Sequence, residues 1–329
     1  MKILRHYTNQ NGIALMMVLW VFVLLIGLAT EFAFSMKGEV NTTRNFKEDA
    51  ESYHLAKAGI HLGMAEILAP ARFHALHSDH GLITGIPLPS GIKAQEEATI
   101  KEKNAYRSIK RKAIPLGRGT ITYTLEDENG KIPINQATRN ILVKVLTTLG
   151  VKIGENRDII ADSILDWIDV DNNYRLNGAE NDFYQNQNPP YFAKNGSIEN
   201  LDELIKIRGV DEKLLYGTNE LLGLNHFFTV YKLKAINPNT ASPHVLSVIF
   251  SESQMKLIIN TRKEKGFYDN STSDYFIIRS TGRIDGSPTN HTIKTVIQKI
   301  SGKNGLKLLT HYWDDNSFEN IIKPEFEIN

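Results

Sequence analysis

The sequence contains no cysteine. Disulfides, thiolate metal sites and a cysteine nucleophile are therefore excluded. It also lacks any run of five like charges, and its formal net charge is only +1 over 329 residues. No nucleic-acid-binding tail and no polybasic membrane patch is therefore expected. Because a disulfide-free exported domain needs another source of stability, a bound metal ion is one option.

The sequence motifs of the common enzyme classes are missing as well. The chain has no G-x-S-x-G elbow, P-loop, G-x-G-x-x-G or H-E-x-x-H motif. The acidic residues between positions 166 and 182 could in principle serve a metal-dependent hydrolase. A calcium ion held there by a full cage of oxygen ligands would, however, leave no open coordination position for hydrolysis. We therefore expect a protein that is not an enzyme.

Charge is absent from residues 13–29, IALMMVLWVFVLLIGLA. At ~1.5 Å per residue this run is about 25 Å long as a helix, which is enough to enter or span a bilayer. Lys2 and Arg5 precede it without any acid, so the leader should stay cytosolic and the body should follow on the far side. An uncleaved signal anchor is one alternative. A signal peptide is another, although Ala33–Phe34–Ser35 is a poor cleavage site.

A helix is predicted to continue beyond the membrane, because Glu39–Leu68 has no proline and Pro70 follows it. A mixed small and apolar stripe at helical spacing lies along it: Leu55, Ala58, Gly59, Leu62, Ala65 and Glu66. Further along, residues 119–126, 274–284 and 291–300 read as strands, and the last two form a hairpin. A long helix packed on a small antiparallel sheet would account for them.

Between these strands the chain is predicted to be helical and to contain a repeat. Ile132–Leu146 aligns with Ile236–Phe250, and Asn135 and Asn239 are expected to supply capping oxygens. Chance similarity of two capped helices is the alternative. Residues 201–215 resemble a helix-hairpin-helix, a motif that often grips DNA phosphates. Acidic residues surround this hairpin, so no nucleic acid is expected there.

The most chemically specific stretch is 166–184, DWIDVDNNYRLNGAENDFY. Asp169, Asp171, Asn173 and Glu180 occupy positions 1, 3, 5 and 12 of a calcium loop, with the Arg175 carbonyl at position 7. Tyr174 replaces the usual glycine, so a regular EF-hand is not expected. A solvated acidic loop is the alternative. The density of carboxylates favours a calcium site, because a divalent cation would relieve their repulsion.

The N-terminal pattern resembles a type IV pilin-like precursor: a short basic leader that ends in glycine, followed by an apolar run and an amphipathic helix. The resemblance implies that a prepilin peptidase cuts after Gly12 and that Ile13 becomes the methylated N-terminus. Most such proteins carry glutamate at the fifth mature position, where this chain has Met17. Within a filament that carboxylate pairs with a neighbouring subunit, so an apolar residue suits a subunit with no neighbour above it.

Several further segments resemble the K-type minor pseudopilins of type II secretion systems, the GspK family. They are DW-I-D-x-D, G-A-E-x-D-x-Y, Pro189–Pro190–Tyr191, LDEL-x-x-I-RGV and I-N-P-N-T-A. The resemblance implies an α+β fold, with a pilin-like helix and sheet and a large inserted helical domain that is SAM-like or helix-hairpin-helix-like. It also implies calcium in that domain, with Asp169, Asp171, Glu180 and Asp182 matching the acidic motif; Asn173 is added from the spacing alone.

On this interpretation the chain is a single-pass inner-membrane protein with a periplasmic body, at the pseudopilus tip. Its partners would be the I- and J-type pseudopilins, possible H-type subunits and the prepilin peptidase. The alternative is a signal-anchored envelope protein that binds DNA. The expected segments are the leader (1–12), membrane helix (13–30), periplasmic helix (31–70), first part of the sheet (71–128), inserted domain (129–235), second repeat module (236–270), last strands (271–302) and tail (303–329).

Overall fold

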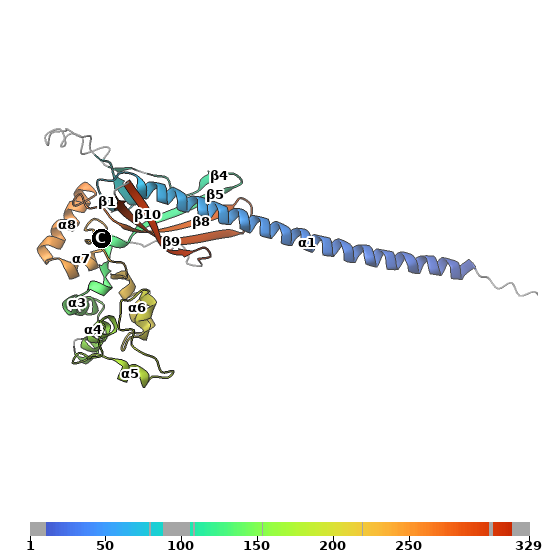
Figure 1. The fold of residues 1–329 in the computed structure, drawn as a ribbon. Helices are drawn as coiled ribbons and strands as arrows, with labels where there is room; N and C mark the ends of the chain where they lie inside the picture. Colours follow the sequence, from blue (N-terminus) through green and yellow to red (C-terminus); the bar gives the residue numbers. More distant parts are fainter. Residues whose placement is uncertain are drawn as a thin grey trace, which may run out of the picture.

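A single long helix carries a body of sheet and shorter helices at its carboxyl-terminal end (Figure 1). The computed structural model describes residues 11–78, 80–87, 106–107, 109–152, 154–218, 220–302 and 305–317. Most of the predicted leader lies outside these ranges. The helix, α1 (Asn11–Leu68), has 58 residues and is therefore about 87 Å long. Within the described ranges it is the one helix long and apolar enough to cross a membrane.

The main sheet is antiparallel, with strand order β10-β9-β8-β5-β4. The predicted strands at 119–126, 274–284 and 291–300 are confirmed as three of its members. The range 303–329, expected to be a tail, instead contributes the edge strand β10. The bounds are β4 (Ile114–Leu116), β5 (Gly119–Asp127), β8 (Tyr275–Ile284), β9 (Asn290–Gly302) and β10 (Gly305–Asp314).

The range 71–128, expected to be the first part of the sheet, contributes β4 and β5 to the main sheet and three short strands to a second small sheet. Its order is β1-β2-β3, with bounds His74–His77, Gly81–Gly85 and Tyr106–Arg107. Arg111 holds this region against α1, because its guanidinium forms a buried ion pair with Glu66. Tyr123 also donates a hydrogen bond to Glu66, and burial together with the Glu66 charge raises the pKa of Tyr123 to about 12.

Glycines set the distance between α1 and the sheet. A Cβ at Gly59 would collide with Ser280 and Ile121, and one at Gly63 would meet Ile278 at 2.9 Å. This close approach decides which face of the helix is buried. The predicted stripe is correct at Leu55, Gly59 and Glu66, but wrong at Leu62 and Ala65, which face solvent. The buried face instead runs through Ser52, Leu55, Ala56, Gly59, Ile60, Gly63, Glu66 and Ile67.

The helical part of the body is an insertion between two paired strands. β5 and β8 are neighbours from Gly119↔Ile284 to Asp127↔Phe276, so the chain leaves the sheet at Asp127 and returns at Tyr275. Its longer helices are α3 (Arg139–Thr148), α4 (Glu155–Ile168), α7 (Pro243–Ile249) and α8 (Glu252–Lys265). The insertion has its own hydrophobic core, separate from the core between α1 and the sheet.

A buried carboxylate stands where the insertion leaves and rejoins the sheet. Asp127 accepts hydrogen bonds from the backbone N–H of Asn129 at 2.8 Å and the Asn237 amide at 3.0 Å. The hydroxyls of Thr240 and Ser273 each donate to it at 2.6 Å. Burial nevertheless raises the pKa of Asp127, and these hydrogen bonds oppose the rise. The four donors come from the start, middle and end of the insertion, so Asp127 joins them at one point.

Both copies of the predicted repeat begin a helix, but the predicted caps are wrong. Thr138 caps α3 and Ser242 caps α7, each through its hydroxyl. Each asparagine side chain instead accepts a hydrogen bond from a backbone N–H that is distant in the sequence. Asn135 accepts from the N–H of Ile198 at 2.7 Å, and Asn239 accepts from the N–H of Tyr268 at 2.6 Å. Hydroxyls of Thr138 and Ser242 are closer in sequence to the free N–H groups, which leaves each asparagine for a long-range contact.

The predicted hairpin at 201–215 is made of shorter helices than expected. Its first part is a 3-10 helix, η3 (Leu201–Lys206), and its second is α6 (Glu212–Tyr216). Gly209 lies between them with φ +86°, a conformation that favours glycine. Arg208, the basic residue of the turn, stacks on Phe183 and donates to the Gly178 carbonyl. Its charge is therefore already engaged within the fold.

The glycine contact between α1 and the sheet predicts a stability difference within one helix. Gly59→Ala should lower the free energy of unfolding by about 2 kcal/mol, because the new methyl group overpacks the interface with β5 and β8. Gly38→Ala is the matched control, since no atom lies within 4 Å of its Cβ position. It should be neutral or stabilising by up to ~1 kcal/mol. Thermal unfolding followed by circular dichroism measures both; equal effects would contradict this packing.

Candidate functional site

The acidic loop connects two helices of the insertion. Helix α4 ends at Ile168 and α5 (Asn181–Gln185) begins after Glu180, so Asp169–Glu180 bridges them. Trp167, in the last turn of α4, is buried in the core of the insertion. Tyr174 does not take the left-handed conformation in which glycine is usual in calcium loops. The helix–loop–helix order is therefore present without the regular turn.

Arg175 lies among the carboxylates at the start of the loop. Its Nη1 is 2.5 Å from Asp166 Oδ1 and 2.6 Å from Asp169 Oδ2. Its backbone N–H also donates to the Asp166 carboxylate at 3.1 Å. Burial raises the pKa of Asp166 while Arg175 opposes that rise. A side chain at position 178 would collide with Asp166, so Gly178 is the residue that leaves room for the buried carboxylate.

Glu180 is the least compensated acid of the cluster. Its side chain is buried, the residue being 2% exposed, and neither carboxylate oxygen has a hydrogen-bond partner. Burial and the charges of Asp166, Asp169 and Asp171 raise its pKa to about 7. Oδ1 of Asp169 is also buried without a partner. Buried acceptors without donors are rare in folded proteins, and a bound cation is one way to satisfy them.

The remaining predicted ligands lie at the surface. Asp171, Asn173 and Asp182 are exposed, and Asp171 accepts a hydrogen bond from the backbone N–H of Asn173 at 2.8 Å. Over the described ranges, no three His, Asp or Glu side chains are grouped tightly enough to form a metal site. The structure therefore places Asp169 and Glu180 on the buried side of the loop and the other three outside it.

Two members of this cluster were not predicted as ligands from the sequence. One is Asp166, whose signal was its place in the acidic run. The other is Asn195, which has φ +46°, a left-handed conformation that asparagine tolerates. Its amide nitrogen donates to the Asp171 carbonyl at 2.8 Å, while its Oδ1 is buried without a partner. No sequence spacing connects Asn195 to the loop, because it reaches the loop from a later segment.

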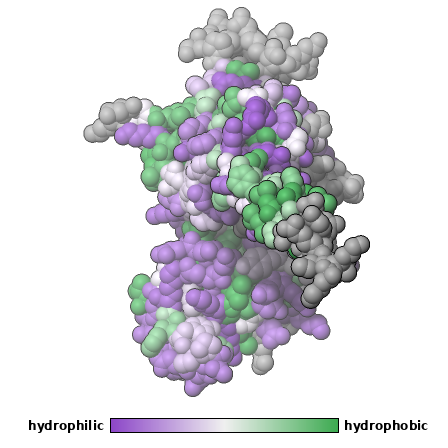
Figure 2. Space-filling model, turned by 90° about the vertical axis from the view of Figure 1, so that its right-hand side faces the viewer, coloured by the Kyte–Doolittle hydropathy of each residue, from purple (hydrophilic) through white to green (hydrophobic). Residues whose placement is uncertain are grey.

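A second candidate region is the amino-terminal half of α1. Every large apolar side chain from Ile13 to Leu28 is at least 52% exposed, and Met17 is 63% exposed. Figure 2 views the molecule from the side toward which α1 projects, and its apolar surface contrasts with a largely hydrophilic insertion. An exposed apolar surface of this length requires lipid or other protein segments around it.

The carboxylate arrangement predicts a strong effect of Gly178→Ala. The added methyl group would displace the buried Asp166 carboxylate from Arg175, and we expect a loss of about 2 kcal/mol in the free energy of unfolding. Gly196→Ala is the control in a neighbouring segment, because its Cβ would meet only the Lys194 carbonyl at 3.7 Å. Urea unfolding compares them, and a larger loss for the control would show that Gly178 is not constrained as described.

Part of the chain is similar to known proteins. Residues 123–219 match the family model described as type II secretion system (T2SS), protein K. A relative from Escherichia coli strain K12 is 28% identical over 206 residues, 63% of this chain and 60% of that protein. The type II secretion system protein K of Klebsiella pneumoniae is 25% identical over the same shares. The chain thus matches about 60% of the length of these relatives.

Two further matches cover different shares of the chain. The type II secretion system protein K of Pseudomonas aeruginosa is 25% identical over 273 residues, 79% of this chain and 74% of that protein. The crystal structure of the GspK-GspI-GspJ complex from enterotoxigenic Escherichia coli contains a chain with 17% identity and a TM-score of 0.47. That match covers 64% of this chain and 84% of the other. The family match over residues 123–219 and these sequence relatives show that the chain is similar to type II secretion system protein K, GspK, over part of its length.

Proposed function

We propose that this protein is a minor pseudopilin of the type II secretion system, which starts or caps pseudopilus assembly at the tip for protein export across the outer membrane. The observation that carries the proposal is α1. Its first half is apolar and exposed, while its second half packs on the sheet through Gly59 and Gly63. Similarity to type II secretion system protein K indicates the secretion system to which such a subunit would belong.

The position at the tip is argued from charge. Met17 would be the fifth residue after cleavage behind Gly12, and it is one of an unbroken series of exposed apolar residues. A carboxylate at that depth needs a partner in the next subunit. A terminal subunit has no such partner, so methionine avoids the cost of an unpaired buried charge. The insertion adds bulk beside the sheet (Figure 1), where it would hinder further addition of subunits.

The same reasoning gives the proposed location and partners. The exposed α1 surface would cross the inner membrane once and then pack against I- and J-type pseudopilins, with H-type subunits as further candidates. A prepilin peptidase would remove residues 1–12 and leave Ile13 as a methylated N-terminus. The body would lie in the periplasm. The helix-hairpin-helix-like segment would then serve packing within the insertion, since its Arg208 already contacts Phe183 and Gly178.

The test of this function is cleavage behind Gly12. Gly12→Val should leave the leader attached and reduce secretion to background, because the peptidase needs a small residue at that position. Gly38→Val, in an open part of the same helix, should still be processed. Mass analysis of the N-terminus of membrane-extracted protein, together with a secretion assay, reads out both. Normal secretion by a chain that still starts at Met1 would contradict the proposal.

We also propose that the acidic loop binds calcium. Support comes from buried oxygens of Asp169, Glu180 and Asn195 that have no hydrogen-bond donor. These three, with the predicted Asp171, Asn173 and Asp182, are the residues that would hold the ion. Hard oxygen ligands suit calcium. The bound ion would offset the carboxylate repulsion that Arg175 alone offsets now, and would stabilise a domain that has no disulfides.

Calcium binding predicts opposite effects of Glu180→Gln in two conditions. The raised pKa of Glu180 means that its contribution to stability is lost as pH rises from about 4.5 to about 7. At pH 8 in chelator, Glu180→Gln should therefore unfold at a higher temperature than the wild type. In ~1 mM calcium the wild type should gain several degrees and Glu180→Gln much less.

Glu199→Gln is the control for this experiment, because Glu199 is an exposed acid of a nearby segment. It should keep the full calcium response. A wild-type protein whose unfolding temperature does not change between chelator and calcium would overturn the calcium proposal, while leaving the pseudopilin proposal untouched.

A further inference from the structure

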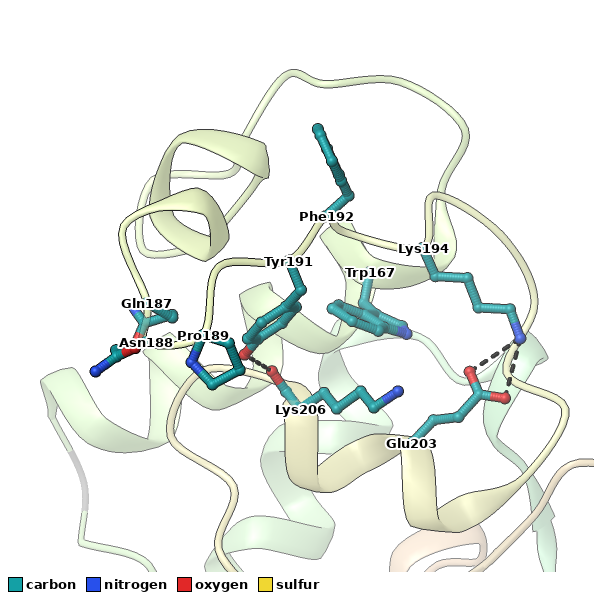
Figure 3. Close-up of a pocket in the computed structure, with 9 residues that line it drawn as sticks. All are labelled: Trp167, Gln187, Asn188, Pro189, Tyr191, Phe192, Lys194, Glu203 and Lys206. Atoms are coloured by element: carbon teal, nitrogen blue, oxygen red, sulfur yellow. Dashed lines mark hydrogen bonds and ion pairs between the residues drawn. The ribbon is translucent and has the colours of Figure 1, made fainter.

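An open cavity of about 870 Å³ lies beside the acidic loop and is used by neither proposal above (Figure 3). The end of α4, the segment after α5 and the 3-10 helix η3 form its walls. Its walls combine aromatic and apolar side chains with a few charged ones. The residues that matter here are Trp167, Pro189, Tyr191, Lys194, Glu203 and Lys206.

Trp167 presents an unsatisfied donor in this cavity. The residue is 3% exposed, and its indole N–H has no hydrogen-bond acceptor. In Figure 3 the indole nitrogen lies on the side of the cavity occupied by Glu203 and the Lys206 amine. A buried tryptophan usually finds an acceptor for this group, because an unpaired donor is costly. The missing acceptor is therefore a specific observation that points to a ligand.

The carboxylate and the tyrosine hydroxyl that line the cavity are already hydrogen-bonded. The Glu203 carboxylate accepts from Lys194 Nζ at 3.0 and 2.9 Å, and from the backbone N–H of Glu199 at 3.0 Å. The Tyr191 hydroxyl donates to the Lys206 carbonyl at 2.7 Å. Lys206 is exposed and its ammonium forms no ion pair with any residue that the structure describes. The cavity thus offers the unpaired Trp167 N–H, the exposed Asn188 amide and the Lys206 ammonium, while its carboxylate is already paired.

This pattern selects the chemistry of the ligand. A carboxylate can accept from the indole N–H and pair with the Lys206 ammonium. Tyr191 and Pro189 give an apolar wall beside it, whereas the Phe192 ring, 69% exposed, points away from this wall in Figure 3. The exposed Lys206 side chain lies under the indole in Figure 3 and can rotate to admit the carboxylate. An open cavity with an apolar wall suits an extended chain better than a small enclosed molecule.

We propose that this cavity binds an extended segment of a partner protein in which an acidic side chain lies next to an aromatic one. The acid contacts Trp167 and Lys206, and the aromatic ring packs on Tyr191 and Pro189. The Lys194–Glu203 pair stays in place and closes one side. Lysine and tryptophan together thus give charge selectivity at a largely apolar surface.

The test uses the full chain in detergent and a fluorescent peptide, Ala-Pro-Glu-Phe-Ala-Ala, followed by anisotropy. The same peptide with Gln in place of Glu should bind at least about tenfold more weakly, as expected for loss of a charge-assisted hydrogen bond. Lys206→Ala should weaken binding of the acidic peptide by a similar factor. Trp167→Phe, which keeps the apolar ring but removes the N–H, should weaken it about fivefold.

Lys263→Ala is the matched control, since Lys263 is an exposed lysine on α8, away from the cavity. It should bind the acidic peptide as the wild type does. Circular dichroism shows whether Trp167→Phe is folded, and Lys206→Ala tests the same site from the surface if it is not. Equal binding of the two peptides, unchanged binding by Lys206→Ala, or no binding of the acidic peptide at ~1 mM would each overturn the proposal.

Discussion

Asp127 is a buried carboxyl group at the point where the insertion leaves and rejoins the sheet, between the paired strands β5 and β8. A buried carboxylate is tolerated when donors surround it, and here the donors belong to both ends of the insertion. Thr240 and Ser273 reach it from residues more than one hundred positions further along the chain. Because the two hydrophobic cores are separate, the helical domain is held to the sheets by this contact together with the stacking of Tyr231 on Tyr275 and of Phe73 on Phe267.

The position of α1 follows from a different constraint, which is close contact between glycines and a sheet. Gly59 and Gly63 on the helix allow the strands to approach, and the buried Glu66–Arg111 pair fastens the neighbouring small sheet to the same helix. One half of α1 is thereby committed to the body. The other half has no partner within the described chain. The carboxyl-terminal half of α1 is therefore part of the folded body, while the amino-terminal half is left for a membrane or a filament.

Helix α4 brings two chemically different surfaces together. Asp166 points its charge toward Arg175 and the acidic loop, while the next residue, Trp167, lines the cavity with its indole. The Asn195 amide donates a hydrogen bond to the Asp171 carbonyl and so connects the segment after α5 to the acidic loop. The end of α4 therefore lies between the proposed cation site in the loop that follows it and the proposed peptide site that Trp167 lines.

Local patterns in the sequence determined the apolar helix, its end before Pro70, the three predicted strands and the acidic run, since each depends on neighbours along the chain. Tertiary contacts decided the rest. The rotation of α1 depends on strands that collide with any Cβ at Gly59, and β10 becomes a strand by pairing with β9. Arg175 pairs with Asp166, and the Asn195 amide reaches the acidic loop. No sequence pattern predicts these contacts, because only the folded chain brings the residues together.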